Sequence, residues 1–391
     1  MKLLVALSRF PWPIEKGDKL RAYYQLRGLA EEHEVHLICL NEAPVSEPDR
    51  RQLDFCSSIQ VIPHPKFKVA LNLAGAIFNR APFQVNYFRS GAMKRALAET
   101  IHREKIEVVY VQLIRLGLNL PDKGAAGWFL DYMDAFSIGM EKRIRQSRAA
   151  MRPFARIEAR RLRAYEAALA GRFDGCSIIS ERDGEALPPA VRKRTEIIPN
   201  GVGEGFFAEL DRPATLDFDL IFFGNMGYHP NVQSARYLVE EVIPALEARG
   251  FTPKICLAGA RPAPLLQSYA GPNVTVTGFV DDIRAWVLRS KLAIAPLIAG
   301  QGLQNKLLES MAMGVPTLTT PLANSALQAV NGRDIVVCDS PPDFAVAILE
   351  LLQSPEKAAQ IGAAGREFVA RNYRWRAMNS QLSAALDKCR R

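Results

Sequence analysis

The sequence predicts an α/β protein with two doubly wound domains, each a parallel sheet covered by helices. Short β-branched runs alternate with stretches of helical periodicity, which is typical of parallel α/β folds. The alternation stops at the turn residues 199–202 and then starts again, and 391 residues are more than one ordinary core accommodates. The hydrophobic share of 48% and the charged share of 23% fit a soluble globular protein.

The first half of the chain supplies the elements of the first domain. Strands are expected at residues 2–8, 34–40, 59–63, 108–112, 128–131, 175–179 and 196–199. Helices are expected at 18–32 and 92–103, and a long arginine-rich pair at about 138–170. The N-terminal run is apolar for only a few residues and continues into Phe10-Pro11-Trp12-Pro13, so it predicts a buried strand rather than a signal peptide.

The second half repeats this alternation without repeating the sequence. Strands are expected at 219–223, 254–258, 274–277, 292–295, 317–319 and 335–337. Helices are expected at 232–249, 303–313 and 344–353, with a last one at 373–388. We therefore expect an N-terminal domain over 1–204, a C-terminal domain over 205–372, and a terminal segment, 373–391, that crosses back to the first domain.

The net charge of +9 lies in the first half of the chain. Residues 1–194 contain 32 Lys and Arg against 22 Asp and Glu, whereas the remainder contains 18 against 19. A basic half suits an anionic membrane surface or a phosphorylated substrate. Nucleic acid is not expected as a partner, because no helix-turn-helix, zinc finger or basic-aromatic motif is present.

Two segments of the first half bear on membranes. Residues 67–78 form an apolar helical stretch with basic neighbours, and 142–163 are densely cationic. Such a surface could dock on anionic lipid, and a core-facing helix beside solvated charges is the alternative. No apolar run is long enough to span a bilayer. The expected location is cytoplasmic, with the inner face of the plasma membrane as a possible docking place.

The cysteines and histidines predict no metal site. The six cysteines are scattered, form no CxxC pair and lie mostly in apolar strand-like runs, so free buried thiols in a reducing compartment are expected. The five histidines show no metal-ligand spacing. We expect neither a metal nor a cofactor.

Ligands of open α/β sheets bind beyond the carboxyl ends of the strands. Gly17 lies in the first such loop and allows close approach to the backbone, although an ordinary solvated loop is the alternative. No GxGxxG fingerprint is present, so a dinucleotide is not expected.

The loop at 299–304 and the helix after it give the strongest local signal. Gly302 permits a tight approach, and the helix that starts near Leu303, Gln304 and Asn305 offers free N–H groups to a diphosphate. Lys306 and Glu309 share one face of this helix, the lysine suited to phosphate and the carboxylate to ribose hydroxyls. A surface Lys–Glu pair is the alternative.

The stretch GLQNKLLESMAMGVPTLTT resembles the donor-binding signature of the family-4 (group 1) retaining glycosyltransferases, which have the GT-B fold. Their Glu-x7-Glu motif would place its second glutamate on Glu309 and its first on Gln301. The resemblance implies that Gln301 orients the donor sugar by hydrogen bonds, without the negative charge of a glutamate. It also implies a nucleoside-diphosphate sugar as donor and no divalent cation.

Other segments carry the same resemblance. Residues 199–202 with Phe206-Phe207 resemble the family's hinge motif, except that Gly203 replaces an aspartate. Gly224 and Asn225 follow the first strand of the donor domain, where most members have an Arg and a Lys; Gly-Asn-Met is similar to an exopolysaccharide-associated subgroup. Lys306 would then supply the missing cation. Gly278, Phe279 and Val280 resemble the loop that holds the nucleobase.

The acceptor side is expected at the strand ends of the first domain. Asp131 and Asp134 follow a strand and suggest acid–base or hydroxyl-orienting work, with a helix cap as the alternative for Asp134. Gln112 and Arg115 follow another strand and could meet an acceptor phosphate, unless Arg115 is a solvated loop charge.

The leading interpretation is a hexosyltransferase-type glycosyltransferase that moves a sugar, with retention, to a glycan or lipid-linked glycan in polysaccharide synthesis. The catalytic set would be Lys306, Glu309, Gln301, Asp131 and Asp134. The alternatives are a non-catalytic nucleotide-sugar-binding subunit and, less favoured, a nucleotide-sugar epimerase.

Overall fold

The computed structural model describes residues 1–14, 16–146, 149–208, 213, 215–299 and 303–391. The chain folds into two compact units: unit 1 comprises Met1–Pro199 with Trp375–Arg391, and unit 2 comprises Asn200–Arg374. Unit 2 thus begins before the expected boundary at 204/205, because Val202 N donates to Tyr373 O and Arg374 pairs with Glu204.

Unit 1 is built on a parallel sheet of seven strands in the order β3-β2-β1-β4-β5-β6-β7. The strands are β1 (Lys2–Leu7), β2 (Glu34–Asn41), β3 (Ser58–Pro63), β4 (Val108–Gln112), β5 (Gly127–Asp131), β6 (Gly175–Ile178) and β7 (Thr195–Ile197). Its helices are α1 (Gly17–Glu32), α2 (Glu47–Arg51), α3 (Lys66–Gly75), α4 (Phe83–Tyr87), α5 (Gly91–Arg103), α6 (Phe136–Gln146), α7 (Arg152–Ala170), α8 (Glu181–Gly184), α9 (Pro189–Arg192) and α18 (Trp375–Asp387). Single 3₁₀ turns are η1 (Ala76–Phe78), η2 (Ile114–Asn119) and η3 (Ala149–Met151).

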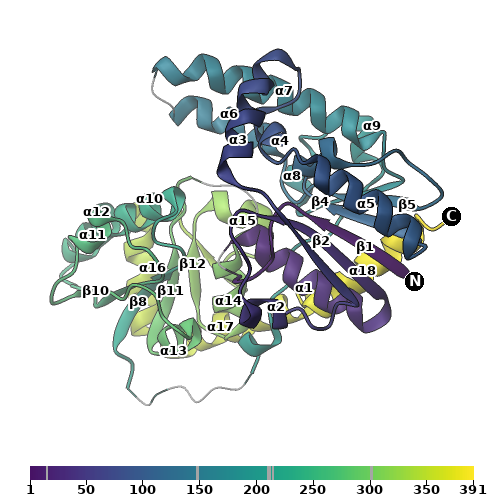
Figure 1. The fold of residues 1–391 in the computed structure, drawn as a ribbon. Coiled ribbons are helices and arrows are strands. Elements are labelled where there is room, and N and C mark those ends of the chain that lie inside the picture. Colours follow the sequence, from purple (N-terminus) through teal and green to yellow (C-terminus); the bar gives the residue numbers. More distant parts are fainter. Residues whose placement is uncertain (15, 147–148, 209–212, 214, 300–302) are drawn as a thin grey trace. The chain divides into compact units, whose positions relative to one another are not determined.

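Both faces of this sheet are buried, as a parallel sheet requires. Along β1, Leu4 and Ala6 face one apolar cluster, whereas Leu3, Val5 and Leu7 face the other. The second cluster includes side chains of α18, which lies beside α1 (Figure 1). The terminal helix therefore completes the core of unit 1.

Unit 2 is built on a six-stranded parallel sheet in the order β10-β9-β8-β11-β12-β13. The strands are β8 (Phe218–Phe223), β9 (Ile255–Ala258), β10 (Val274–Val276), β11 (Ser290–Ala295), β12 (Thr317–Thr319) and β13 (Val336–Val337). The helices are α10 (His229–Tyr237), α11 (Ile243–Glu247), α12 (Pro264–Gln267), α13 (Ile283–Leu288), α14 (Asn305–Ala312), α15 (Pro321–Leu327), α16 (Pro341–Gln353) and α17 (Pro355–Asn372), with a 3₁₀ turn η4 (Glu204–Phe206).

Several helices of unit 2 differ from the prediction, which did not name α12, α13, α15 or α17. The helix expected at 232–249 is divided by a π-helical turn, η5 (Leu238–Val242), which precedes Pro244 in the first turn of α11. Proline has no N–H to continue the hydrogen-bond ladder, so the break has a local cause. Helix α17 was not predicted at all. Its Gly362 allows the backbone to approach Gly314, since a Cβ there would lie 2.2 Å from the Gly314 carbonyl oxygen.

Candidate functional site

The carboxyl ends of β8 and β11 form the centre of the unit 2 sheet. The chain leaves β8 toward β9 on one side and leaves β11 toward β12 on the other. Ligands of doubly wound sheets bind in the crevice that opens where the connections diverge in this way. The loops after β8 and β11, and the start of α14, are therefore the first place to look for a site.

Two glycines bring the backbone close together at this edge. Gly224 directly follows β8 with a φ of +145°, and Gly259 directly follows β9 with a φ of +137°. A Cβ on Gly259 would lie 1.8 Å from the Gly224 carbonyl oxygen, and one on Gly224 would lie 3.0 Å from Asn231 Nδ2 and 3.3 Å from Lys306 Cε. Side chains at these positions would collide with their neighbours, so glycine is required.

Lys306 is a buried cation at the same edge. Its Nζ donates a hydrogen bond to Asn231 Oδ1 at 2.8 Å and lies 5.4 Å from the centre of the Phe222 ring. No carboxylate among the described residues is within ion-pair distance of this nitrogen. Burial lowers the pKa of Lys306 to about 8, and the charge of Glu309 opposes this shift. A buried ammonium with only a neutral acceptor is well placed to receive an anion.

Glu309 lies one helical turn after Lys306 on α14. Burial raises the pKa of its carboxyl group to about 7, and the charge of Lys306 acts in the opposite direction. The carboxylate has no hydrogen bond to any side chain or amide in the described ranges. It is thus a free acceptor for ligand hydroxyls.

Two amides at the start of α14 have no acceptor among the residues that the structure describes. Gln304 precedes the helix and makes no side-chain cap, while the amides of Leu307 and Leu308 donate to its carbonyl oxygen at 3.0 and 3.4 Å. The amides of Asn305 and Lys306 have no acceptor in the part of the chain that the structure describes. Leu303 is buried just before the helix. Gln301 and Gly302 lie outside the described residues.

The loop after β10 lies at the same carboxyl edge of the sheet, next to the loop after β9. Gly278 has a φ of +71°, and its carbonyl oxygen accepts from Gly259 N at 3.1 Å. Phe279 is 73% exposed, and Val280 beside it is partly buried. On the other side of Gly224, Asn225 Oδ1 accepts from Gly227 N at 3.0 Å, which fixes the turn. The residues predicted for donor binding and described here therefore lie on neighbouring strand ends of one sheet.

Asn231 was not singled out from the sequence. It lies 75 residues from Lys306 along the chain, and no local pattern links the two. Its amide nitrogen donates to Asn225 O at 2.9 Å while its oxygen accepts from Lys306. Asn231 thus connects the loop after β8 with α14.

In unit 1, Asp131 is fully buried, which argues against the catalytic role expected for it. Arg21 Nε donates to Asp131 Oδ2 at 2.6 Å and Arg21 Nη2 to Oδ1 at 3.1 Å. The hydroxyls of Tyr110 and Ser177 donate to the same carboxylate at 3.0 and 2.9 Å. All its acceptor capacity is used within the core, so Asp131 holds β5 and α1 together rather than contacting an acceptor.

The other residues expected on the acceptor side lie near the carboxyl edge of the unit 1 sheet. Asp134 is partly buried, and burial together with the charge of Asp183 raises its pKa to about 7. Arg115 lies in η2 and Gln112 ends β4, where its Nε2 is buried and has no hydrogen-bond partner in the described part of the chain. Gly17 begins α1.

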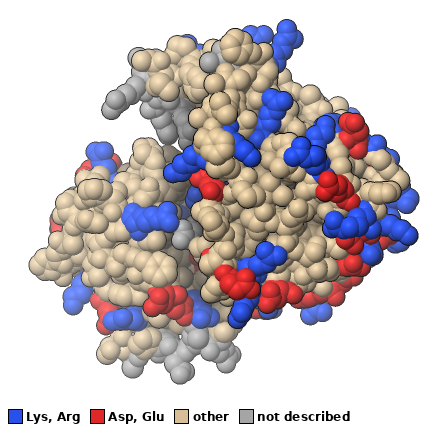
Figure 2. Space-filling model, viewed as in Figure 1, with Lys and Arg blue, Asp and Glu red and all other residues tan. Residues whose placement is uncertain are grey.

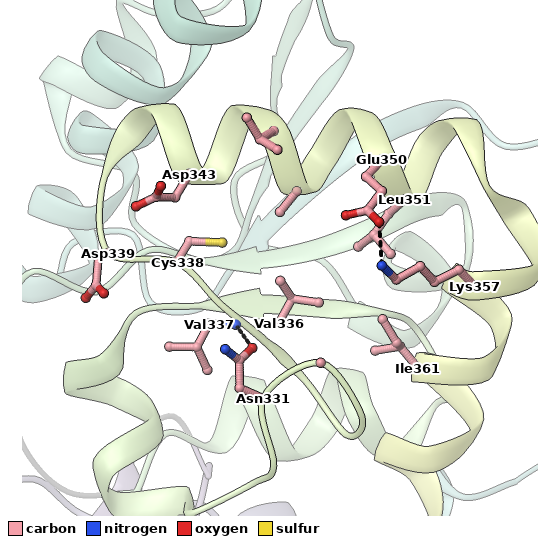
Figure 3. A pocket seen from close by; sticks show the side chains of 13 residues that line it. Asn331, Val336, Val337, Cys338, Asp339, Asp343, Glu350, Leu351, Lys357 and Ile361 are labelled. Carbon is pink, nitrogen blue, oxygen red and sulfur yellow. Dashed lines mark hydrogen bonds and ion pairs between the residues drawn. The ribbon is translucent and has the colours of Figure 1, made fainter.

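A cavity of about 520 Å³ lies elsewhere in unit 2, between β13 and α16 (Figure 3). Asp343 and the Glu350–Lys357 ion pair line it, together with Val336 and Ile361. It opens at the edge of the sheet, separated from β11 by β12 and β13. None of the predicted site residues that the structure describes lines this cavity. We therefore do not include the cavity in the candidate site at α14.

The described residues contain no group of three or more His, Cys, Asp or Glu side chains that could hold a metal ion. Among the same residues, no helix combines the length and hydropathy that crossing a bilayer demands.

Both units have the doubly wound α/β topology, in which ligands bind at the carboxyl edge of the sheet. Residues 217–354, which include Gly224, Gly278 and Lys306, match the model of the family described as Glycosyl transferases group 1. No curated protein sequence matches the chain.

Solved structures with this fold cover nearly the whole chain. Sucrose-phosphate synthase from Thermosynechococcus elongatus superposes with a TM-score of 0.70 at 16% identity, covering 98% of each chain. HepE from Anabaena, in complex with UDP, gives 0.68 at 14% identity, covering 99% of this chain and 100% of that one. A glycosyltransferase from Rickettsia africae gives 0.66 at 12% identity, covering 99% and 98%. The GT-B fold expected from the sequence is thereby confirmed.

Proposed function

We propose that this protein is a glycosyltransferase that moves a sugar from a nucleoside-diphosphate sugar to a hydroxyl group of a glycan. The family match over 217–354 supports sugar transfer, and the UDP bound to HepE of the same fold supports a nucleotide-sugar donor. The observation that carries the proposal is Lys306, a buried ammonium at the start of α14, where the amides of Asn305 and Lys306 have no acceptor among the described residues.

In this proposal the donor diphosphate lies against the start of α14. Lys306 and the amides of Asn305 and Lys306 neutralise the charge that develops on the leaving diphosphate. Glu309 accepts hydrogen bonds from ribose hydroxyls, and Gln301 orients the sugar. Gly224 and Asn225 line the diphosphate, while Gly278, Phe279 and Val280 hold the base. Catalysis is then positional and electrostatic, and neither a metal nor another cofactor takes part.

The finer features follow from the sequence resemblance. We expect retention of the anomeric configuration, a hexose as the transferred sugar, and a glycan or lipid-linked glycan of exopolysaccharide synthesis as the acceptor. Asp134 is the remaining acid–base candidate on the acceptor side, because its raised pKa keeps a proton available near neutral pH.

A screen followed by product analysis tests the proposal. Nucleoside-diphosphate sugars are first ranked by the rise in melting temperature that they produce, since a ligand specific for the folded state stabilises it. The best donor is then incubated with an acceptor panel, and the new linkage is assigned by NMR. Transfer with retention supports the proposal. Binding without transfer or hydrolysis would favour the non-catalytic subunit, and conversion of the donor without acceptor would favour an epimerase.

We also propose that unit 1 docks on anionic lipid. Large apolar side chains are exposed on α3, on η1, at the end of η3 and at the start of α7: Phe67, Leu71, Phe78, Met151, Phe154 and Ile157. These elements form one surface, because Arg161 Nη1 donates to Ala76 O at 3.1 Å and the Phe83 and Phe154 rings lie 4.8 Å apart.

Exposed cations are close neighbours of these apolar side chains along the chain: Lys66, Lys68, Arg80, Arg156 and Arg160. Tan and blue atoms predominate over this region in Figure 2. Exposed apolar side chains with cations beside them suit a membrane with negative headgroups, because each cation near the surface adds about 1 kcal/mol to the binding free energy.

Vesicle flotation tests this docking. The protein is expected to float with vesicles that contain phosphatidylglycerol at low salt, and Phe78→Ser, which removes a side chain that is 91% exposed, should weaken flotation severalfold. Val346→Ser, at an exposed position of unit 2, is the matched control. Equal flotation of both variants, or none by the wild type, would contradict the proposal.

A further inference from the structure

In unit 1 the strand connections diverge between β1 and β4, at the carboxyl edge of the sheet. The chain leaves β1 toward β2 on one side and leaves β4 toward β5 on the other. Arg9 follows β1, and Arg115 follows β4 in η2. Two cations from separate elements therefore converge where a doubly wound sheet binds its ligand.

These two arginines share one carboxylate. Arg9 Nε lies 3.3 Å from Asp18 Oδ2, and Arg115 Nη1 lies 3.4 Å from the same oxygen. Within the described ranges no other carboxylate is within ion-pair distance of either guanidinium. Asp134 faces Arg115 from further away, and its raised pKa leaves it partly protonated near neutral pH. The cluster thus carries an excess of positive charge.

Aromatic rings hold the guanidinium faces and leave donors unused. Arg9 and Arg115 lie 6.0 and 5.3 Å from the centre of the Phe88 ring, and Arg115 lies 4.9 Å from that of Phe136. Arg115 Nε is nonetheless buried with no hydrogen-bond partner among the described residues, as is Gln112 Nε2 at the end of β4. Buried donors that the protein leaves unsatisfied are costly unless another molecule supplies the acceptor.

We propose that Arg9 and Arg115 form a binding subsite for a phosphate group, with Asp18 bridging the two guanidiniums in its absence. A phosphate presents several oxygens to donors that arrive from different directions, and guanidinium forks match it well. The subsite rests on the proposed function, since it assigns a phosphorylated acceptor to unit 1. The phosphate belongs either to a soluble sugar phosphate or to a lipid headgroup.

Titration calorimetry with three probes tests the subsite. The probes are inorganic phosphate, glucose 6-phosphate, and vesicles of phosphatidic acid in phosphatidylcholine. Arg9→Gln is the main variant, because the Arg9 side chain is more exposed than that of Arg115. Arg103→Gln, at an exposed arginine paired with Glu104, is the control. Binding of at least one probe by the wild type is expected to weaken tenfold or more in Arg9→Gln and to stay unchanged in Arg103→Gln.

Removing the shared carboxylate is expected to change the affinity in the opposite direction. Asp18→Asn is expected to bind the same probe more tightly, because one negative charge leaves the subsite, whereas a merely structural cluster would lose affinity or not respond. A response to glucose 6-phosphate assigns a soluble acceptor, and a response to vesicles alone assigns a lipid phosphate. Equal affinity of wild type and Arg9→Gln for all three probes would overturn the subsite.

Two further measurements separate this inference from the proposed function. Each titration is repeated in the Lys306→Ala background, where an Arg9-dependent signal must persist if the subsite lies in unit 1. UDP is titrated into Arg9→Gln, which should bind it as the wild type does. If the wild type binds phosphate through Arg9 but binds no nucleotide, the donor proposal fails and the subsite stands.

Discussion

At the scale of single residues, the environment of Lys306 decides what the α14 edge can bind. An ammonium with a neutral amide as its only hydrogen-bond partner among the described residues is destabilised by burial. A bound diphosphate would supply the missing counter-charge, and a hydrogen bond to a charged group contributes about 1.5–3 kcal/mol. The ammonium of Lys306 is therefore expected to stabilise the complex with a diphosphate more than it stabilises the free protein.

The pKa of Lys306 leads to a pH prediction. Because this pKa is lowered to about 8, the side chain loses its charge as the pH rises through that value. The affinity for UDP should therefore fall between about pH 7 and about pH 10 in the wild type, and bound UDP should shift the midpoint upward. Lys306→Arg should flatten this profile, because a guanidinium stays charged throughout. Dissociation constants measured across this range check the prediction, and parallel profiles would contradict it.

The buried pair of Arg21 and Asp131 leads to a stability prediction. Arg21→Met leaves the carboxylate in the core without its cation, which costs about 3–5 kcal/mol. Arg27→Met, an exposed position on the same helix, should change stability little. Calorimetric unfolding of both variants measures the difference. Equal melting temperatures would show that Asp131 does not depend on this arginine.

At the scale of secondary-structure elements, strand positions were accessible from the sequence, whereas several helices were not. Buried parallel strands appear as short apolar β-branched runs between turns, which is why every strand of both sheets overlaps an expected one. Helix α17 was missed because Gly362 and Gly365 weaken the helical signal. Both glycines serve close packing, since a Cβ on Gly365 would lie 2.6 Å from Asp334 O.

The terminal helix α18 leads to a prediction for unit 1. Leu382 is fully buried in the cluster formed with α1 and β1, so Leu382→Ala should destabilise the protein by about 2–5 kcal/mol. Lys388→Ala removes an exposed ion pair with Glu196 at the end of the same helix and should cost no more than about 1 kcal/mol. Denaturant unfolding followed by tryptophan fluorescence compares the two. A small effect of Leu382→Ala would mean that α18 is dispensable for the core.

At the scale of the whole molecule, the periodicity of the chain defined the fold class, and motif resemblance located the donor edge. The pairing of distant residues could not be predicted in the same way. Arg21 and Asp131 are 110 positions apart, and a carboxylate at a strand end looks the same in sequence whether it faces a ligand or the core. Asn231 and Arg9 were missed for the same reason, because only the fold places them beside Lys306 and Arg115.

Each unit has one proposed anion site: the start of α14 in unit 2 and the Arg9–Arg115 pair in unit 1. Unit 2 offers a buried lysine and helix amides, and unit 1 offers paired arginines, each at the point where strand connections diverge. A transferase that joins a nucleotide-linked sugar to a phosphorylated acceptor needs both kinds of site. Transfer cannot begin unless the donor binds at the unit 2 site.

Calorimetric titration of UDP into the wild type, Lys306→Ala and Lys291→Ala tests that site most directly. Lys291 is an exposed lysine of unit 2 paired with Asp219, and it serves as the control for loss of one positive charge. We predict that Lys306→Ala weakens binding by about 10- to 100-fold, the loss of one charge-assisted hydrogen bond, while Lys291→Ala binds as the wild type does. Equal binding of UDP by all three proteins, or its absence from the folded wild type, would contradict the account.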